Sequence, residues 1–266
     1  MKVLIGCEFS GAVRRAFRAV GHEAWSCDLL PAEDDSPYHI QGDLLSILTD
    51  GWDLAVFHPP CTHLAVSGAR WFKDKQVEQA EALGFVRSLL AAPIPRIALE
   101  NPVSIISSRI RKPDQVIQPW MFGHGETKAT CLWLKNLPLL APTEVVDGRE
   151  AKVHRMPPGP DRWKNRSRTY QGIANAMAEQ WGVTMKHRTK DGREINLKDM
   201  TLDHLLNTIA WIKRRAEEGV IVTSGSGGVA DDDLWDDEYT IYDDEALEEL
   251  NYHEYVKELS RRKDLV

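Results

Sequence analysis

Short apolar runs alternate with amphipathic stretches along residues 2–182. Each apolar run is a few residues long and stops at glycine, proline or a polar residue, which is typical of buried strands. The strands predicted in this way cover 2–6, 22–27, 54–57, 96–99, 115–120 and 129–134. Apolar residues at helical spacing predict helices over 12–20, 75–91 and 169–181. This alternation predicts an α/β protein with a mostly parallel sheet and helices on both faces.

The strand predicted at 54–57 runs directly into His58-Pro59-Pro60-Cys61. Proline has no N–H to give to a sheet, so the strand must stop and the chain must turn there. The carboxyl ends of parallel strands are where open α/β sheets bind ligands. Cys61 is therefore a candidate nucleophile, and the alternative is a buried cysteine beside a proline turn.

A second polar tip follows the next strand, where 96–99 ends in Glu100-Asn101-Pro102. If the two strands are neighbours, Cys61 and Glu100 project from the same edge of the sheet. Packing alone does not call for a thiol and a carboxylate side by side, which favours catalysis. The alternative is that Glu100 only caps the helix that follows.

The chain begins with the outline of a nucleotide-binding βαβ unit. A strand, a turn of mostly small and polar residues at 6–11, a helix that Gly21 ends and a second strand lead to Asp28. In such units an acidic residue at this place bonds a ribose hydroxyl. The glycine fingerprint of dinucleotide sites is absent, and Asp28 could instead cap the loop after it.

A loop-like basic segment is predicted at 152–168, and Trp163 lies within it. Basic residues interleaved with an aromatic ring suit a phosphate backbone and a stacked base, while the alternative is a solvated loop. The basic residues are Lys152, Arg155, Arg162, Lys164, Arg166 and Arg168.

A second unit is predicted to begin near residue 186. Residues 190–193 form a hairpin-turn signal, 201–218 a helix, 224–228 a flexible linker and 244–262 a helix in an acidic tail. The sequence thus divides into a first domain at 1–185, a hairpin and helix at 186–223, and a linker and tail at 224–266. The tail could be solvated, bind a protein partner or mimic the charge of nucleic acid.

The charge is unevenly distributed along the 266 residues. Residues 231–266 hold 14 acidic and 4 basic residues, a net charge of −10, which leaves 26 acidic and 29 basic residues in 1–230. The total of −7 therefore does not exclude a nucleic-acid partner. No apolar run is long enough to span a bilayer and no signal peptide is recognised. Four widely spaced cysteines argue against a zinc site and disulfides, and predict a reducing cytoplasm.

Pro59-Pro60-Cys61 after one strand and Glu100-Asn101 after the next resemble the paired signature of the DNA cytosine-5 methyltransferases. The resemblance covers about 2–182 and includes the helix at 171–176, which is similar to the final motif of that family. Glu100-Asn101-Pro102 and the Gly-His-x-Glu-Thr-Lys turn at 123–128 are similar to compact phage-type members. The resemblance implies a Rossmann-like methyltransferase fold and a location in a bacterial host or a phage-infected cell.

The resemblance also implies the roles of the candidate residues. The substrate would be cytosine in DNA, flipped out of the duplex or single-stranded, and the cofactor S-adenosyl-L-methionine. The resemblance assigns catalysis to Cys61, Glu100 and Asn101. Cofactor binding falls to Cys7, Glu8, Phe9, Ser10, Gly11, Asp28, Asp43, Pro59 and Asn175. DNA binding falls to Lys128, Arg162, Lys164, Arg166 and Arg168, and no metal is expected.

Three features depart from the family pattern. The Phe-x-Gly-x-Gly cofactor loop is replaced by Gly6-x-Glu8-x-Ser10, and Lys128 is the nearest substitute for a missing Gln-x-Arg-x-Arg motif. The target-recognition region expected after residue 134 is reduced to a few tens of residues, and the unit from 186 onward is a candidate replacement. Two alternatives stay open: the same fold acting on a free cytosine nucleotide, or an inactive methyltransferase-like regulator that binds DNA.

Overall fold

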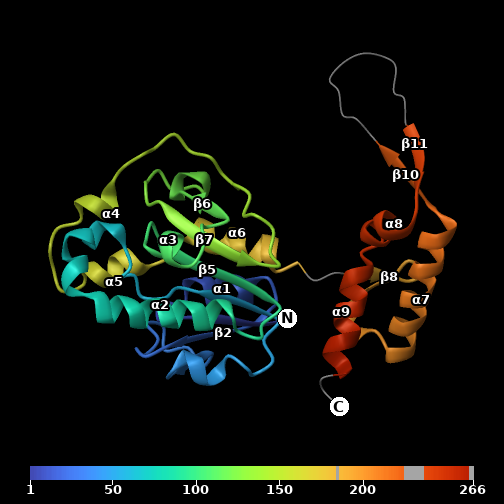
Figure 1. Ribbon diagram of the computed structural model, residues 1–266, viewed down its shortest axis with the longest axis horizontal. Coiled ribbons are helices and arrows are strands. Elements are labelled where there is room, and N and C mark those ends of the chain that lie inside the picture. The colour runs from blue at the N-terminus through green and yellow to red at the C-terminus, as the bar shows by residue number, and fades with distance from the viewer. Residues whose placement is uncertain (184–185, 225–236, 264–266) are drawn as a thin grey trace. The chain divides into compact units, whose positions relative to one another are not determined.

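The computed structural model describes residues 1–183, 186–224 and 237–263. These residues form two compact units, Met1–Val183 and Thr184–Val266, which are described separately (Figure 1).

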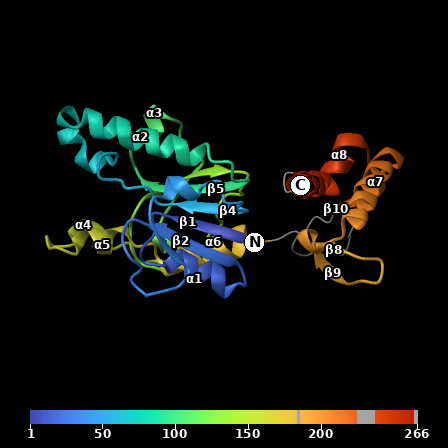
Figure 2. The same cartoon turned by 90° about the horizontal axis from the view of Figure 1, so that it is seen from below.

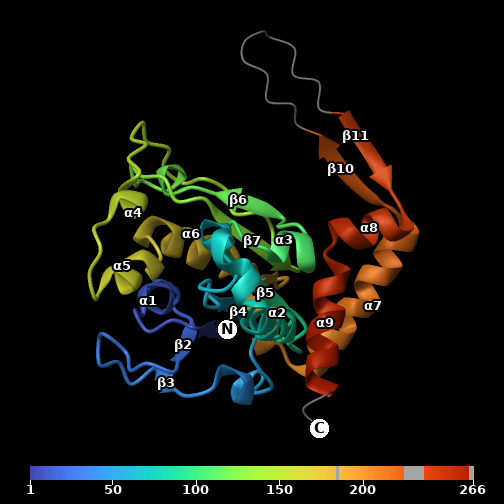
Figure 3. The same cartoon turned by 60° about the vertical axis from the view of Figure 1, so that its left-hand side comes forward.

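The first unit is built on a seven-stranded sheet with the order β3-β2-β1-β4-β5-β7-β6. Strands β1 to β5 run parallel to one another, and β7 is antiparallel to both of its neighbours, β5 and β6. Strands β3 and β6 form the two edges (Figure 3). The strands are β1 (Lys2–Gly6), β2 (Glu23–Asp28), β3 (His39–Gln41), β4 (Leu54–Phe57), β5 (Arg96–Pro102), β6 (Gln115–Ile117) and β7 (Thr130–Lys135).

Helices cover both faces of this sheet. Figure 2 shows α1 (Ala12–Ala19) and α6 (Gln171–Trp181) on one face and α2 (Gln76–Leu90) and α3 (Ile106–Arg109) on the other. Each face has its own buried apolar cluster, with Phe17 and Met177 among the residues of one and Leu83 and Trp133 among those of the other. The predicted Rossmann-like α/β fold, with a mostly parallel sheet and helices on both faces, is therefore confirmed.

The predicted strands agree with the structure more closely than the predicted buried face of α2 does. The helical spacing predicts that Val77, Ala80, Leu83, Gly84, Val86 and Leu90 of α2 face the core. Leu83 and Val86 are buried and Leu90 packs partly buried against the same cluster, whereas Val77 is 70% exposed and the buried Leu89 was not predicted. The apolar stripe of α2 is narrow and follows Leu83, Val86 and Leu89, because only the middle and end of the helix lie on the sheet. Strand β3 was not predicted, since its three residues carry no apolar run.

The segment predicted as a loop at 152–168 contains two short helices, α4 (Lys152–Arg155) and α5 (Arg162–Ser167). They lie beyond the carboxyl ends of the strands (Figure 2). The prolines between them keep each helix to less than two turns, since proline cannot continue a helix interior.

The second unit contains two hairpins and three helices in its described residues. A threonine side chain, that of Thr201, caps α7 by accepting a hydrogen bond from the N–H of His204 at 3.2 Å. Leu205, Ile209 and Ile212 of this helix pack with Tyr255 in a small apolar core. The elements are β8 (Lys186–Arg188), β9 (Glu194–Asn196), α7 (Leu202–Glu218), β10 (Val220–Ser224), β11 (Asp237–Ile241), α8 (Asp243–Glu249) and α9 (Tyr252–Lys263).

The end of the chain differs from the prediction of one helix over 244–262. Two helices occur, because Asn251 between them adopts a left-handed conformation with φ 55°. Strand β10 pairs with β11, so residues predicted to lie in different parts, 186–223 and 224–266, share one unit. The predicted linker lies outside the described residues beyond Ser224. No helix among the described residues is long and apolar enough to cross a membrane.

Candidate active site

A cavity of about 120 Å³ opens where β1, β4 and β5 end, and segments from five parts of the first unit line it. Cys61 and Glu100 lie in this one cavity, together with the turn after β1. The lining residues are Cys7, Glu8, Phe9, Ser10, His58, Pro59, Pro60, Cys61, Glu100, Asn101, Pro102, Lys128, Arg166, Ser167, Arg168 and Thr169. The predicted convergence of the two strand tips follows from the pairing of β4 with β5.

Cys61 follows the two prolines and is partly exposed. The backbone carbonyl of Cys61 accepts hydrogen bonds from the N–H groups of Leu64 and Ala65, which closes a tight turn after it. Burial raises the pKa of the Cys61 thiol, and the negative charge of Glu100 raises it further. Lys128 and Arg166 act in the opposite direction, because their positive charges favour the thiolate.

Glu100 is paired with a histidine across the two strands. Nδ1 of His58 lies 3.1 Å from Oε2 of Glu100, and the two side chains are 9% and 15% exposed. Burial by itself raises the pKa of Glu100, but the hydrogen bond with His58 and the charge of Lys128 outweigh burial and lower it. Glu100 is therefore a carboxylate in the resting protein at neutral pH.

Asn101 is buried at the end of β5 and links the two strand tips. Its Nδ2 donates a hydrogen bond to the backbone carbonyl of Pro59 at 2.9 Å. Its Oδ1 is also buried and has no partner among the described residues. Asn101 thus fixes the turn that carries Cys61 and keeps one acceptor free.

The turn after β1 is held by Glu8. The Glu8 carboxylate accepts hydrogen bonds from the N–H groups of Val13 at 2.7 Å and Arg14 at 3.2 Å. These are free N–H groups at the start of α1, where a ligand anion binds in many nucleotide sites. Cys7 adopts φ 58° to make this turn, and Gly11 adopts φ 69° just before the helix. Glu8, which departs from the Phe-x-Gly-x-Gly pattern, therefore occupies the free N–H groups at the start of α1 with its own carboxylate.

Two further carboxylates lie at the ends of β2 and β3. Oδ1 of Asp28 accepts a hydrogen bond from the N–H of Leu30, and Asp43 accepts one from the N–H of Leu45, both at 3.0 Å. Burial raises the pKa of Cys7 to about 12, and the charges of Asp28 and Asp43 add to this shift. The electrostatic coupling places both carboxylates near Cys7. Burial also raises the pKa of Asp28 itself, because it removes water from the carboxylate, and a ligand hydroxyl that donates to Asp28 would stabilise the charged form.

Several predicted site residues lie outside the lining of this cavity. Asn175 is exposed on α6 and accepts a hydrogen bond from Gln171 at 2.7 Å, while Nε of Arg162 bonds the carbonyl of Met156 at 2.9 Å. The predicted residues that do not line the cavity are Gly11, Asp28, Asp43, Arg162, Lys164 and Asn175.

The basic segment from α5 to α6 lies over the mouth of the cavity. The rings of Phe9 and Trp163 are 5.8 Å apart, and Arg168 forms a 2.8 Å ion pair with Glu33. Nζ of Lys128 reaches the carbonyl of Arg168 at 3.4 Å. Arg166, Ser167, Arg168 and Thr169 thereby become part of the cavity wall.

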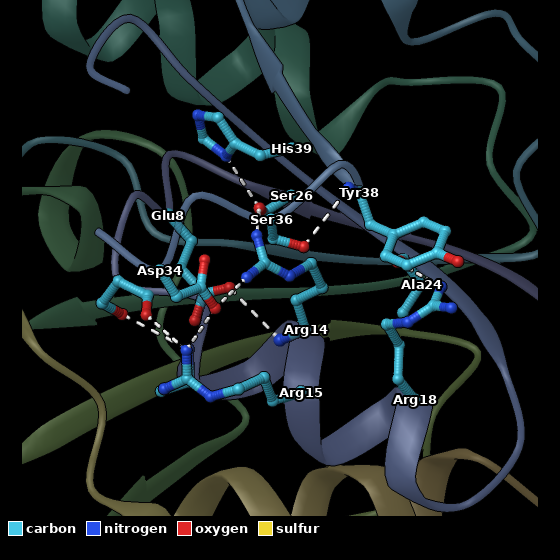
Figure 4. A network of polar contacts seen from close by, with 12 residues as sticks. Glu8, Arg14, Arg15, Arg18, Ala24, Ser26, Asp34, Ser36, Tyr38 and His39 are labelled. Atoms are coloured by element: carbon cyan, nitrogen blue, oxygen red, sulfur yellow. Dashed lines mark hydrogen bonds and ion pairs between the residues drawn. The ribbon is translucent and has the colours of Figure 1, made fainter. Parts of the chain in front are cut away.

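A buried arginine holds the loop that follows β2. The Arg14 guanidinium is 1% exposed, donates to Oγ of Ser26 at 2.6 Å and pairs with Asp34 (Figure 4). Arg15 joins the same carboxylate at 2.6 Å. The hydroxyl of Ser26 also contacts Nδ1 of His39 at 2.8 Å. This network ties α1, β2 and β3 to the loop carrying Asp34.

Sequence reasoning missed His58 and the network of Arg14 and Asp34. His58 had a usable signal, since a polar residue directly after a buried strand lies beside the next strand tip. Arg14 had none, because its helical position is compatible with a solvated arginine and only the fold places Asp34 beside it. Among the described residues, no cluster of three or more potential ligands could hold a metal ion.

No protein-family profile and no curated protein matches the sequence. Among the solved structures that are similar to this chain are two that it covers over about half their length. A prophage-encoded Escherichia coli protein, named as a DNA modification methyltransferase, has a TM-score of 0.41 at 16% identity over 59% of this chain and 55% of its own. A variant of Spodoptera frugiperda DNMT2 has a TM-score of 0.33 at 13% identity, over 56% and 54%. The sheet order and the helices on both faces make the first unit a Rossmann-like α/β fold.

Proposed function

We propose that the protein transfers a methyl group from S-adenosyl-L-methionine to carbon 5 of cytosine in DNA, with Cys61 as nucleophile and Glu100 as acid. The observation that carries the proposal is the cavity in which the Cys61 thiol and the Glu100 carboxyl lie beside the turn after β1. A nucleophile and an acid are the two groups that activation of a pyrimidine ring at carbon 5 requires.

The residues around the cavity fit the proposed cofactor. Asp28 is the last residue of β2 and Asp43 stands just after β3, and carboxylates at such strand ends accept hydrogen bonds from ribose hydroxyls. Glu8 already occupies the N–H groups at the start of α1, so a ligand carboxylate needs another partner. Lys128, Arg166 and Arg168 are the cationic residues in the cavity wall. When bound, the cofactor supplies an electrophilic methyl group.

Cys61 begins the reaction by adding to carbon 6 of the ring as a thiolate, which makes carbon 5 electron-rich. Because the pKa of Cys61 is raised in the resting protein, the thiolate is a minor species at neutral pH. Lys128 and Arg166 stabilise it. The negative charge of the nearby Glu100 disfavours the thiolate. Protonation of Glu100 removes this charge and a hydrogen bond from the base weakens it, so binding of the base and formation of the thiolate favour each other.

Glu100 stabilises the charge that the addition places on ring nitrogen 3. It does so by sharing or donating a proton, which is a contribution of roughly two to four orders of magnitude in rate for a positioned acid. Asn101 keeps the strand tip in place through Pro59. After transfer a base removes the proton from carbon 5, and Cys61 leaves carbon 6 as its bond breaks.

DNA is favoured as the carrier of the cytosine by the basic segment at the cavity mouth. Lys128, Arg166 and Arg168 line the cavity, and the partly exposed ring of Trp163 lies next to it against Phe9. Cations and an aromatic ring suit a backbone phosphate and an unstacked base. The target base must leave the stack, because Cys61 cannot reach its ring carbon inside a duplex.

The experiment offers labelled S-adenosyl-L-methionine together with duplex DNA, single-stranded DNA or dCMP, each in a separate reaction. Label in DNA at carbon 5 of cytosine, lost in Cys61→Ala with cofactor binding retained, is the expected result. Turnover in Cys61→Ala would overturn the covalent mechanism. Label in neither DNA nor nucleotide would overturn the activity and favour a DNA-binding regulator.

A free cytosine nucleotide is the second candidate substrate, and one observation favours it. Between β7 and α6 the first unit has only the short helices α4 and α5, without a separate recognition domain. A small substrate needs no such domain. Label in dCMP and not in DNA would select this alternative.

A further inference from the structure

His58 and Glu100 are cross-strand neighbours at the floor of the cavity. The registered pairs of β4 and β5 end with Phe57 beside Leu99, so the next residue of each strand stands opposite the other. The backbone N–H of His58 still bonds the carbonyl of Gly6 at 2.9 Å, which fixes the histidine to β1 as well. The backbone of His58 is therefore fixed to β1 before any ligand binds.

The contacts of the two imidazole nitrogens differ. Nδ1 lies 3.1 Å from Oε2 of Glu100, whereas Nε2 is buried and has no partner among the described residues. A nitrogen facing a carboxylate oxygen must carry the proton, because two lone pairs would repel each other. A second proton on Nε2 would leave a buried charged N–H without an acceptor, which is costly. The arrangement corresponds to an imidazole that donates to Glu100 through Nδ1.

We propose that His58 is a positioning residue for Glu100: its Nδ1–H holds Oε2, so that Oε1 is left to face the target base and donate the proton. The inference rests on the proposed function. It adds a residue that selects which carboxyl oxygen reacts, and it assigns no contact between His58 and the base.

The hydrogen bond also sets the acidity of Glu100. Burial raises the pKa of Glu100, but donation from His58 favours the ionised form and, with Lys128, lowers it. Without that donor the carboxyl would be both freer to rotate and a weaker acid. The lost orientation lowers the rate of proton donation, whereas the higher pKa enlarges the protonated fraction of Glu100 and offsets part of that loss; neither change affects DNA binding.

Two amide substitutions of His58 distinguish the role of Nδ1 from that of Nε2. The amide nitrogen of asparagine falls near Nδ1 of the histidine it replaces, whereas that of glutamine falls near Nε2. His58→Asn therefore keeps a donor for Glu100 and gives up only the nitrogen that has no partner. His58→Gln keeps the size of the side chain but removes the donor from its place.

For methyl transfer to DNA, we expect His58→Gln to lower kcat by roughly 10- to 100-fold with KM for DNA unchanged, as for loss of a hydrogen bond to a charged group. His58→Asn should rescue kcat to within about threefold of the wild type. The acid limb of the pH profile should move to higher pH in His58→Gln alone, because the group of lower pKa is Glu100. Equal losses in both variants, equal retention, or the reverse order would overturn the proposal.

A second measurement needs no turnover, so failure of the proposed function is distinguishable from failure of this inference. NMR titration of ¹³C-labelled glutamate side chains gives the pKa of Glu100, and ¹⁵N shifts of the imidazole give its tautomer. The expected result is an Nδ1-protonated His58, with a Glu100 pKa that is low in the wild type and His58→Asn and higher in His58→Gln. An Nε2-protonated His58 or an unchanged pKa in His58→Gln would overturn it.

Discussion

The side-chain amide of Asn101 donates a hydrogen bond to the backbone carbonyl of Pro59 at 2.9 Å, and so joins the tip of β5 to the turn that carries Cys61. The bond lies in the interior, where a carbonyl that loses its donor has no water to replace it. The position of the candidate nucleophile therefore depends on a residue of the next strand.

We expect Asn101→Ala to lower the free energy of unfolding by about 1–3 kcal/mol, the cost of leaving a buried carbonyl unpaired, and to reduce turnover as well. Asn136 provides a matched control, because its Nδ2 bonds the carbonyl of Pro95 at the same distance but at an exposed site. Asn136→Gly keeps the left-handed backbone there, where φ is 52°. Urea unfolding and turnover should both show the larger loss for Asn101→Ala. Equal losses in the two variants would contradict a special contribution from the buried hydrogen bond between Asn101 and Pro59.

Glu100→Gln should slow methyl transfer by roughly two to four orders of magnitude, because an amide cannot donate a proton to the ring nitrogen as an acid does. Affinity for cofactor and DNA should change little, since the side chain keeps its size. Single-turnover measurements with saturating DNA separate the two effects. A rise in KM with unchanged kcat would instead assign Glu100 to positioning.

The ion pairs of Asp34 with Arg14 and Arg15 should make the free energy of unfolding depend on pH in the acidic range. Burial raises the pKa of Asp34, but hydrogen bonds from Arg14 and Arg15 prevail and lower it below its unfolded value. The unfolded chain then takes up the proton first as pH falls. The contribution of Asp34 is fully present above the unfolded pKa of about 3.9 and is lost as pH falls through the lower folded value.

Asp34→Asn should therefore be less stable than the wild type at pH 6, and the difference should shrink below about pH 4. Urea unfolding at a series of pH values measures this. Asp147→Asn, at an exposed position, is the control and should track the wild type throughout. A pH-independent difference for Asp34→Asn would show that lost packing, and not charge, causes the effect.

Gly172 lies where α6 begins against the Gly-His-x-Glu-Thr-Lys turn. A Cβ at this position would come within 1.9 Å of the carbonyl oxygen of Phe122, while the Gly172 N–H donates to Nε2 of His124 at 3.0 Å. Gly172→Ala should lower the melting temperature, since backbone must move to admit the methyl group.

Gly84→Ala is the opposite case and tests the same substitution. Gly84 lies in the interior of α2, and an added Cβ meets nothing within 4 Å. Alanine there should stabilise the protein by roughly 0.5–1 kcal/mol, because it restricts the unfolded chain and favours the helix. Differential scanning calorimetry should place the wild type between the two variants. Similar melting temperatures for both would contradict the close approach at Gly172.

Arg166 should contribute one phosphate contact if DNA is the substrate. Arg166→Gln should weaken binding to all DNA sequences alike and reduce the slope of log affinity against log salt by about 1. Lys112→Gln is the control, because Lys112 is exposed next to Arg111, which bonds the carbonyl of Leu134 toward the opposite end of the sheet. An unchanged slope in Arg166→Gln would place the DNA backbone elsewhere.

Strands β1, β4 and β5 were predictable from sequence because buried parallel strands are continuous apolar runs with sharp polar or proline ends. The same rule placed Cys61 and Glu100 at one sheet edge. Strand β3 and the strand β11 in the tail escaped prediction, since short strands at an edge or in a two-stranded hairpin bury little apolar surface and leave a weak pattern.

The sequence by itself thus determined the fold class, the polar strand tips and the residue types at the cavity. Only the tertiary structure decided how those side chains are engaged. It turned Glu8 toward the start of α1, placed Nδ1 of His58 beside Glu100, and brought Trp163 against Phe9 from far along the chain. The physical reason is that periodicity reports burial within one element, whereas hydrogen bonds between elements depend on strand register and on loops whose paths no local pattern encodes.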